Sequence, residues 1–179
     1  MKPLSDSEII EKVLNGNTDL FRLIVDRYKS PVAAVIKGML GNCPEAEDVG
    51  QETFIRFFNS LASFRGDAAL KTYLIRIGMN LSLNEIKKRK RYNHNTVYID
   101  SGVIINQDAD LTVPERAEIM EMIQNAMDKL DPKQKSVFIL RIIEGYSTKE
   151  TAKILKIPMG TVLSRLARAM EEMRGLVYR

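Results

Sequence analysis

The chain has little of the residue chemistry on which catalytic and metal sites depend. Its 179 residues include one cysteine, one histidine and no tryptophan. A single cysteine, Cys43, excludes an internal disulfide, and with a single histidine, His94, it leaves no ligand set for zinc. No phosphate-binding glycine loop or nucleophile motif is present. We therefore expect no catalytic residue, metal or cofactor, and an enzyme is the weakest functional interpretation of this sequence.

Long hydrophobic runs are also missing. No apolar segment approaches the roughly 20 residues that a membrane-spanning helix needs. The N-terminus lacks the basic segment and apolar core of a secretion signal. The hydrophobic fraction, 45%, is that of an ordinary globular protein. We therefore expect a cytoplasmic protein without membrane insertion, in a reducing compartment that suits its single cysteine.

Lysine and arginine are missing from one stretch of the chain. The formal net charge is +4. Residues 92–114 contain three aspartates and neither lysine nor arginine, so the parts on either side are more basic than the net charge suggests. Basic domains of this kind suit a nucleic-acid partner.

The strongest local pattern lies in residues 144–174 and predicts two helices separated by a tight turn. Ser147 and Glu150 have capping-box spacing, so one helix should start there and run to about Leu155. Pro158 disfavours helical geometry at the residue before it, which predicts a turn and a new start. The second helix has one apolar stripe for packing on the first. That stripe consists of Val162, Leu166, Ala169 and Met173.

The other side of this second helix carries hydroxyl and guanidinium groups. They belong to Thr161, Ser164, Arg165 and Arg168. This arrangement is typical of a DNA-reading helix-turn-helix, whose second helix enters the major groove. A helical hairpin with a solvated basic face is the alternative interpretation.

Helical periodicity extends over most of the remaining chain. It predicts helices over residues 5–14, 18–41, 44–61, 69–91, 115–130 and 131–145, with a kink or a division at Pro31. Residues 92–114 are rich in asparagine and aspartate and lack sustained periodicity, which indicates a linker. The predicted fold is all-α. Two small helical domains, residues 1–91 and 115–179, are joined by this flexible linker, and the C-terminal one contains the helix-turn-helix.

Two helix surfaces allow either a structural or a functional interpretation. An acidic-polar face on the helix over residues 44–61 is usually a solvated surface, but on a basic protein it also suits docking of a basic partner helix. The helix over residues 69–91 ends in five successive cations, which suit either a polyanion or a solvated helix end that complements the dipole. The predicted core stripe of the helix over residues 69–91 consists of Leu70, Leu74, Ile77 and Leu81.

Three motifs, taken in order, resemble the extracytoplasmic-function (ECF) group of bacterial sigma factors, which keep the second and fourth conserved regions of the sigma-70 family. They are residues 48–54, residues 64–66 with 72–80, and residues 145–147 with 158–169. Together they are more specific than any one motif, and the resemblance covers nearly everything outside the linker. It implies a factor that binds core RNA polymerase and directs promoter-specific transcription initiation by reading the minus-ten and minus-thirty-five elements.

The resemblance also implies a role for each candidate residue. The acidic-polar face is expected to bind the clamp coiled coil of core RNA polymerase through Asp48, Gln51, Glu52 and Arg56. Capture of unpaired minus-ten bases and of the adjoining phosphates is expected from Phe64, Arg65, Arg76, Asn80, Lys87, Lys88 and Arg91. Contacts to the minus-thirty-five element are expected from Thr161, Ser164, Arg165 and Arg168.

Four residues depart from the family pattern. Tyr73 stands where tryptophan is usual, and Gly78 replaces a common alanine. Lys156 stands where glycine is frequent in the turn of the helix-turn-helix, which leaves the geometry of that turn open. Leu163 occupies a position that is often basic, which puts one promoter contact in question and predicts a shift in the preferred sequence.

The resemblance implies three partners: core RNA polymerase, promoter DNA and an anti-sigma factor that holds the protein inactive. The sequence ends at Arg179 without a further segment for built-in regulation, so we expect control from a separate protein. The main rival is a helix-turn-helix repressor or activator whose N-terminal domain dimerises or senses a ligand. It would bind duplex operator without polymerase and would leave the acidic-polar face without a role.

Overall fold

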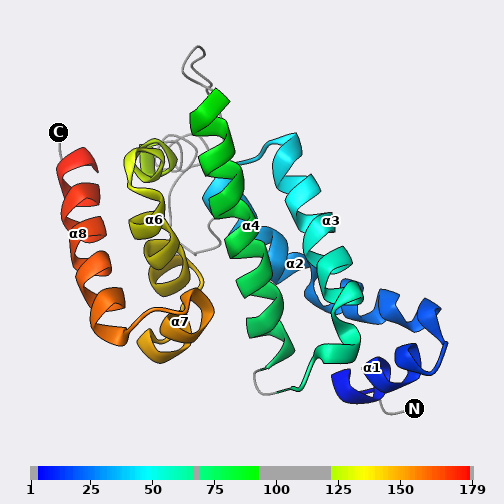
Figure 1. Ribbon diagram of the computed structural model, residues 1–179. Coiled ribbons are helices and arrows are strands. Elements are labelled where there is room, and N and C mark those ends of the chain that lie inside the picture. The colour runs from blue at the N-terminus through cyan, green and yellow to red at the C-terminus, as the bar shows by residue number, and fades with distance from the viewer. Residues whose placement is uncertain (1–3, 67–68, 93–121, 178–179) are drawn as a thin grey trace, which may run out of the picture.

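The computed structural model describes residues 4–66, 69–92 and 122–177, and all regular structure in these ranges is helical (Figure 1). The N-terminal half contains α1 (Asp6–Leu14), α2 (Phe21–Leu40), α3 (Pro44–Asn59) and α4 (Leu70–Tyr92), with 3-10 turns at Thr18–Leu20 and Leu61–Ser63. In the C-terminal half, residues 122–129 are helical. They are followed by α6 (Pro132–Phe138), a π-helical turn (Ile139–Ile143), α7 (Thr148–Leu155) and α8 (Met159–Val177). The prediction of an all-α fold is confirmed.

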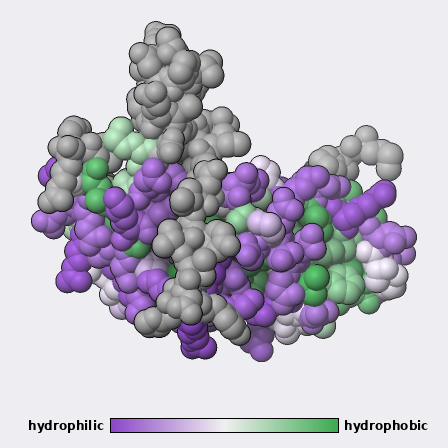
Figure 2. All heavy atoms as spheres, turned by 90° about the horizontal axis from the view of Figure 1, so that it is seen from above, coloured by the Kyte–Doolittle hydropathy of each residue, from purple (hydrophilic) through white to green (hydrophobic). Residues whose placement is uncertain are grey.

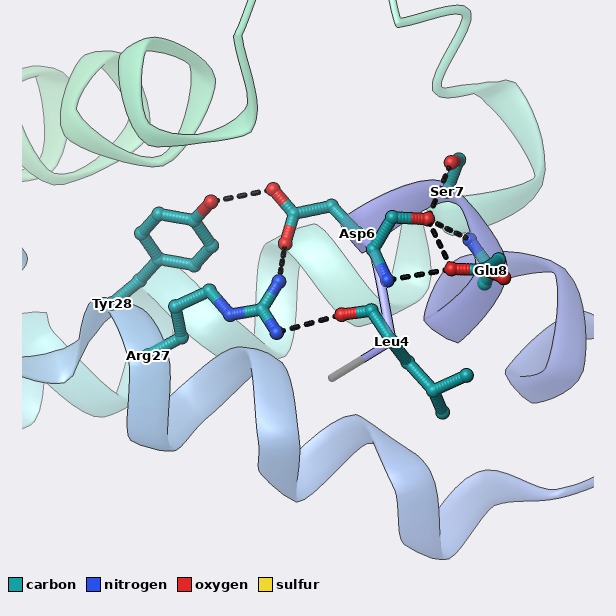
Figure 3. Close-up of polar contacts among 7 residues, drawn as sticks. Leu4, Asp6, Ser7, Glu8, Arg27 and Tyr28 are labelled. Carbon is teal, nitrogen blue, oxygen red and sulfur yellow. Dashed lines mark hydrogen bonds and ion pairs between the residues drawn. The ribbon is translucent and has the colours of Figure 1, made fainter. Parts of the chain in front are cut away.

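Local capping signals set several helix ends. Ser5 caps α1 as predicted, since its Oγ accepts a hydrogen bond from Glu8 N at 3.3 Å while its N–H donates to Glu8 Oε2 at 2.7 Å. Next to this cap, Asp6 accepts hydrogen bonds from Arg27 and Tyr28 of α2 (Figure 3). Burial and the bond to Asp6 raise the pKa of Tyr28 to about 12. These contacts fix α1 against α2.

Pro31 lies inside α2 and does not end it. The helix runs without a break to Leu40, so the alternative of two abutting helices is wrong. Gly41, with φ of 84°, terminates the helix, and its N–H donates to Lys37 O at 2.7 Å. A proline in this position removes one backbone hydrogen bond, which the packing of the surrounding apolar residues outweighs.

Helix α4 lies at the centre of the molecule, with α2 and α3 on one side and α6 and α7 on the other (Figure 1). The predicted core stripe was partly wrong, because Ile77 and Leu81 are only half-buried. Ile75 and Met79, which the stripe omitted, have no exposed surface. A helix that packs against α2, α3 and α7 buries a wider arc than one stripe covers.

The two halves share one hydrophobic core. Leu140, Tyr146 and Ile154 of the C-terminal half belong to the same buried cluster as the N-terminal helices. Across this contact the Nζ of Lys71 lies 5.3 Å from the centre of the Tyr146 ring. A second, smaller cluster holds the C-terminal helices together: Ala126, Met127, Leu130, Phe138, Ala169 and Met173. The sequence did not predict that the halves would pack on each other. The predicted linker lies outside the described residues except for Tyr92, and so does the predicted helix start at residue 115.

Candidate nucleic-acid and partner interfaces

The acidic-polar face predicted on α3 is presented to solvent as one surface. Asp48, Gln51 and Arg56 are exposed and Glu52 is half-buried. Arg56 Nε donates to Glu52 Oε1 at 2.7 Å. An exposed ion pair of this kind contributes about 0 to 1 kcal/mol in water, so a partner can replace it at little cost. The opposite side of α3 packs inward through Thr53, Phe54 and Phe57.

An apolar groove of about 650 Å³ runs beside this face, between α2 and α3. Two of the residues that line it are Ile55 and Phe58, which are 52% and 39% exposed. Lys29 and Lys37 of α2 also line the groove, opposite Gln51 of α3. Figure 2 shows hydrophobic surface on the side of the molecule where α1, α2 and α3 lie. The sequence interpretation did not predict this groove. The available signal was Ile55, an apolar residue among the outward polar positions.

Phe64 belongs to an aromatic cluster and does not project freely. Its ring packs edge-to-face against Phe57 and Tyr73, with centroid distances of 5.5 and 5.0 Å. The Arg76 guanidinium lies over the Tyr73 ring, 5.2 Å from its centre. Arg65, next to Phe64, is exposed. Tyr73, which stands where tryptophan is usual, therefore holds two candidate residues in place, Phe64 and Arg76.

The candidate residues on α4 form a track along one side of the helix. Arg76, Asn80, Lys87 and Arg91 are spaced so that they share this side over about 22 Å of axis. Asn80, Lys87 and Arg91 are exposed, and Arg76 is half-buried at the end near Phe64. Lys88 is exposed too, but it points away from the track and lies 3.6 Å from Glu85. The structure thus brings together four of the five α4 candidates.

Arg89 differs from the other four members of the five-cation run. Its guanidinium turns inward, donating to Cys43 Sγ at 2.9 Å and to Glu45 at 3.2 Å, with Glu85 at 3.6 Å. Its side chain is 31% exposed. Arg89 therefore ties the end of α4 to the start of α3, and the other four cations of the run remain on the surface.

A cavity of about 450 Å³ separates the aromatic cluster from the helix-turn-helix. Phe64, Arg65 and Arg76 line its N-terminal side, and Lys153 and Lys156 of α7 and its C-cap line the other. Candidate minus-ten residues and the helix-turn-helix therefore face each other across this cavity. A nucleic-acid strand on the track of α4 would meet α7 at this point.

The helix-turn-helix forms as the sequence predicts. Ser147 Oγ accepts from Glu150 N at 3.2 Å, and Ser147 N donates to Glu150 Oε2 at 2.8 Å. These bonds lower the pKa of Glu150. Lys156 ends α7 in the left-handed region, with φ of 54°, and is the one non-glycine residue in the described ranges with a positive φ. The turn thus keeps the backbone conformation that glycine usually supplies.

The exposed side of α8 differs in part from the predicted one. Its packing stripe is confirmed, with Val162, Ala169 and Met173 buried and Leu166 half-buried. Ser164 and Arg168 are exposed as predicted, but Thr161 and Arg165 are half-buried at the edge of that side. Leu163 is 55% exposed and Met159 is 54% exposed, and neither was among the predicted DNA contacts.

Two negative findings apply to the described residues. They contain no group of three or more histidine, cysteine, aspartate or glutamate side chains placed to hold a metal ion. The helices within these ranges are all too short or too polar to span a bilayer.

Two family matches cover the same parts of the chain as these surfaces. Residues 24–92 match sigma-70 region 2, and residues 120–173 match sigma-70, region 4. The chain is similar to the solved structure of the sigma factor RpoE in complex with the anti-sigma factor NepR from Bartonella quintana. That match has a TM-score of 0.70, at 24% identity over 88% of this chain and 96% of that one. CnrH in complex with the cytosolic domain of CnrY gives a TM-score of 0.68, at 22% identity over 94% of both chains. These two likenesses establish the fold.

Relatives of higher identity establish the family. The ECF RNA polymerase sigma factor SigW of Bacillus subtilis is 36% identical, over 92% of this chain and 92% of the relative. The RNA polymerase sigma-H factor of Pseudomonas aeruginosa is 32% identical, over 93% of this chain and 90% of the relative. The chain therefore belongs to the ECF sigma factors of the sigma-70 family, which act with RNA polymerase in promoter-specific transcription initiation.

Proposed function

We propose that the two halves divide the work of a sigma factor between them. The N-terminal domain, residues 1–91, binds core RNA polymerase and captures unpaired bases of the minus-ten element. The C-terminal domain, residues 115–179, reads the minus-thirty-five element. The track of Arg76, Asn80, Lys87 and Arg91 along α4 carries this proposal, because it combines cations for phosphates with an amide for a base edge and starts beside an aromatic cluster.

In this proposal each surface has one ligand. Asp48, Gln51, Glu52 and Arg56 bind a helix of core polymerase, and the neighbouring groove takes up its apolar side chains. Phe64 forms a wall of the base pocket through its edge, since Phe57 and Tyr73 already pack against the ring. Arg65 and Lys88 contact backbone phosphates, and Thr161, Ser164, Arg165 and Arg168 contact the minus-thirty-five duplex.

The contact between the halves supports a switch in this function. Lys153 and Lys156 face the same cavity as Phe64 and Arg76, so a promoter strand and the docked helix-turn-helix exclude each other. Core polymerase would separate the halves and place them at the spacing of the two promoter elements. Tethering then makes the second contact intramolecular, so that two modest affinities combine.

The proposed cellular location, the non-catalytic role and the negative partner all follow from the function of a sigma factor. We also propose that the chain acts in the cytoplasm as a subunit without catalysis of its own, because its family acts in transcription initiation together with RNA polymerase. An anti-sigma factor is the proposed negative partner. Structures with TM-scores of 0.70 and 0.68 were solved as complexes with NepR and CnrY, which supports this partner class.

Transcription in vitro tests the division of labour. Bacterial core RNA polymerase is combined with this chain on fragmented genomic DNA, and the new RNA ends are mapped. We expect starts that share two upstream motifs. Gln51→Ala should reduce co-migration with core polymerase, whereas Asn59→Ala, also exposed on α3, should not. Arg168→Ala should keep polymerase binding and relax the upstream motif, with Arg174→Ala as the matched control on α8.

Two results would overturn the proposal. The first is that Gln51→Ala and Arg168→Ala lose the same function, in which case the halves do not divide the work. The second is the absence of new starts from a chain that does not co-migrate with core but shifts duplex DNA alone. That result would favour a repressor or activator.

A further inference from the structure

We propose that Leu163 reads the methyl group of a thymine in the minus-thirty-five element and that Met159 extends this apolar contact. The inference rests on the proposed function of α8 as the DNA-reading helix. It adds a specificity residue of a different chemistry from the hydroxyl and guanidinium contacts at Thr161, Ser164 and Arg168.

The exposure of the two side chains is the first observation. Leu163 and Met159 are the most exposed of the large hydrophobic residues in the described ranges, at 55% and 54%. They lie four residues apart, so their side chains are neighbours on one side of α8. Together they make an apolar edge at the start of this helix.

The packing of α8 does not require this edge. Val162, Ala169 and Met173 supply the buried contacts of the helix and are at most 8% exposed. Leu163 follows Val162 directly and points about 100° away from it around the helix axis. Removing the Leu163 side chain therefore leaves the core of the helix-turn-helix intact.

The position along the helix is the second observation. Met159 is the first residue of α8, and Leu163 lies in its second turn. In a helix-turn-helix, the N-terminal residues of the second helix reach the base edges. Ser164 follows Leu163 directly and is exposed, so this apolar edge borders the side of α8 that carries the polar candidates.

Chemistry then limits what an aliphatic side chain can distinguish. Leucine neither donates nor accepts a hydrogen bond, so it reads no donor or acceptor on a base edge. The C5 methyl of thymine is the apolar group that the major groove presents, and apolar side chains contact it. Leu163 therefore favours thymine over cytosine at the position it faces.

The effect of one methyl group is modest and measurable. Removing a buried methyl-sized group weakens binding about fourfold. Replacing thymine by deoxyuridine removes only that methyl and leaves base pairing unchanged. The comparison therefore isolates the contact proposed for Leu163.

The experiment uses holoenzyme reconstituted from core RNA polymerase and the full chain. Its preferred upstream element is first selected from a randomised duplex library. Each thymine of that element is then replaced singly by deoxyuridine, and the dissociation constants are measured. For the wild-type chain we expect a loss of about fourfold at one or two positions. For Leu163→Ala, thymine and deoxyuridine should bind equally at the position that Leu163 faces.

Two control variants separate this contact from general weakening. Met170→Ala removes an apolar residue that is 40% exposed on α8, about 10 Å further along the axis, and should keep the ratio between thymine and deoxyuridine. Arg168→Ala should weaken binding of both duplexes and also keep that ratio. If wild type and Leu163→Ala show the same ratio at every position, the inference is wrong and the division of labour stands. If the holoenzyme selects no upstream element, the proposed function of α8 as the DNA-reading helix is wrong, and the inference that rests on it is wrong as well.

Discussion

Among the described residues, the buried polar side chains of the N-terminal half are paired internally, whereas several in the C-terminal half have no partner. In α3 and α4, the buried hydroxyls of Thr53 and Ser82 donate to carbonyls one turn earlier, at 2.7 and 2.9 Å. In the C-terminal half, the side chains of Gln124, Arg141, Tyr146 and Thr151 each have a buried polar atom without a partner among the described residues. The two halves therefore differ in how completely their interiors are paired.

The two halves also differ in the size of their hydrophobic clusters, and the N-terminal half again has the more extensive interior. The N-terminal half is built on the larger cluster around Phe57 and Leu74, to which Ile154 of α7 also contributes. The C-terminal half has the smaller cluster around Met127 and Ala169. We infer that the stability of the C-terminal half depends on packing against another surface, and that this half can exchange one such surface for another.

The largest expected effect comes from removing the centre of the larger cluster. Phe57 has no exposed surface, and its ring packs against Phe21, Phe64 and Tyr73. Phe57→Ala should lower the free energy of unfolding by about 3 to 5 kcal/mol. Since Ile154 joins the same cluster, amide protection should fall in α7 as well as in α2 to α4. Urea unfolding and hydrogen exchange measure the two effects.

A matched variant in the smaller cluster tests whether the two halves unfold separately. Met127 also has no exposed surface. Met127→Ala should cost about 2 to 5 kcal/mol locally and lower protection in α6 and α8. An equal loss of protection in α4 would contradict the comparison, because the halves would then unfold as one cooperative unit.

An ion pair in the C-terminal half should give the next largest effect. Lys135 is 5% exposed, and its Nζ lies 2.6 Å from Asp128 Oδ1. Asp128→Ala would leave a buried ammonium group without its carboxylate and should destabilise this half by about 1 to 3 kcal/mol. Lys135→Met keeps the apolar stem and leaves only the half-exposed Asp128, so it should stay within about 1 kcal/mol of the parent. Thermal unfolding of both variants distinguishes a required pair from a replaceable one.

A tight contact between the two halves offers a direct way to separate them. A Cβ added to Gly38 of α2 would lie 3.2 Å from Cδ1 of Ile139 in the π-helical turn. Gly38→Leu should therefore force the halves apart, at a cost of about 1 to 3 kcal/mol. Small-angle scattering should show a larger radius of gyration, and single-stranded minus-ten DNA should bind more tightly without polymerase. Gly175→Leu is the control, because in the described part of the chain nothing beyond its adjacent residues and the backbone of its own helix lies within 4 Å of the Cβ it would add. Unchanged scattering by Gly38→Leu would contradict the switch.

The sequence predicted the helix ends well because their signals are local. Ser5 and Ser147 form capping boxes with partners three residues away. Asp131 accepts a hydrogen bond from Lys133 N at 2.9 Å and Pro132 occupies the first position of α6, which agrees with the predicted helix start at residue 131. Such contacts need no knowledge of distant parts of the chain, so pattern and spacing suffice.

Burial within the site was less predictable because it depends on distant neighbours. Nothing in a run of five cations shows that Arg89 turns toward Cys43 and Glu45. The exposure of Leu163 and the packing of Phe64 on Tyr73 likewise follow from the tertiary arrangement. Residue type thus identified the candidate surfaces, while three-dimensional packing decided which members are free to bind.

The smallest expected effect is a pH dependence at the contact between the halves. Glu144 is half-buried, and burial raises the pKa of its carboxyl above 4.5, with Lys71 acting in the opposite direction. Between that ordinary value and the raised folded value, the folded chain binds more protons than the unfolded chain. This carboxyl therefore makes the free energy of unfolding fall as pH rises through that window. Glu8, Glu45 and Glu150 have lowered pKa values and act in the opposite sense.

Glu144→Gln isolates this contribution from that of the other carboxylates. The difference in stability between Glu144→Gln and the parent chain should grow in favour of the variant as pH rises through the window and then level off. For Glu150→Gln, which removes a carboxyl of lowered pKa, the difference should instead grow in favour of the parent chain as pH rises. Urea unfolding at a series of pH values gives the difference directly. A difference that shrinks with rising pH would mean that Lys71 stabilises the carboxylate more than burial disfavours it, and that the contact between the halves is held by charge.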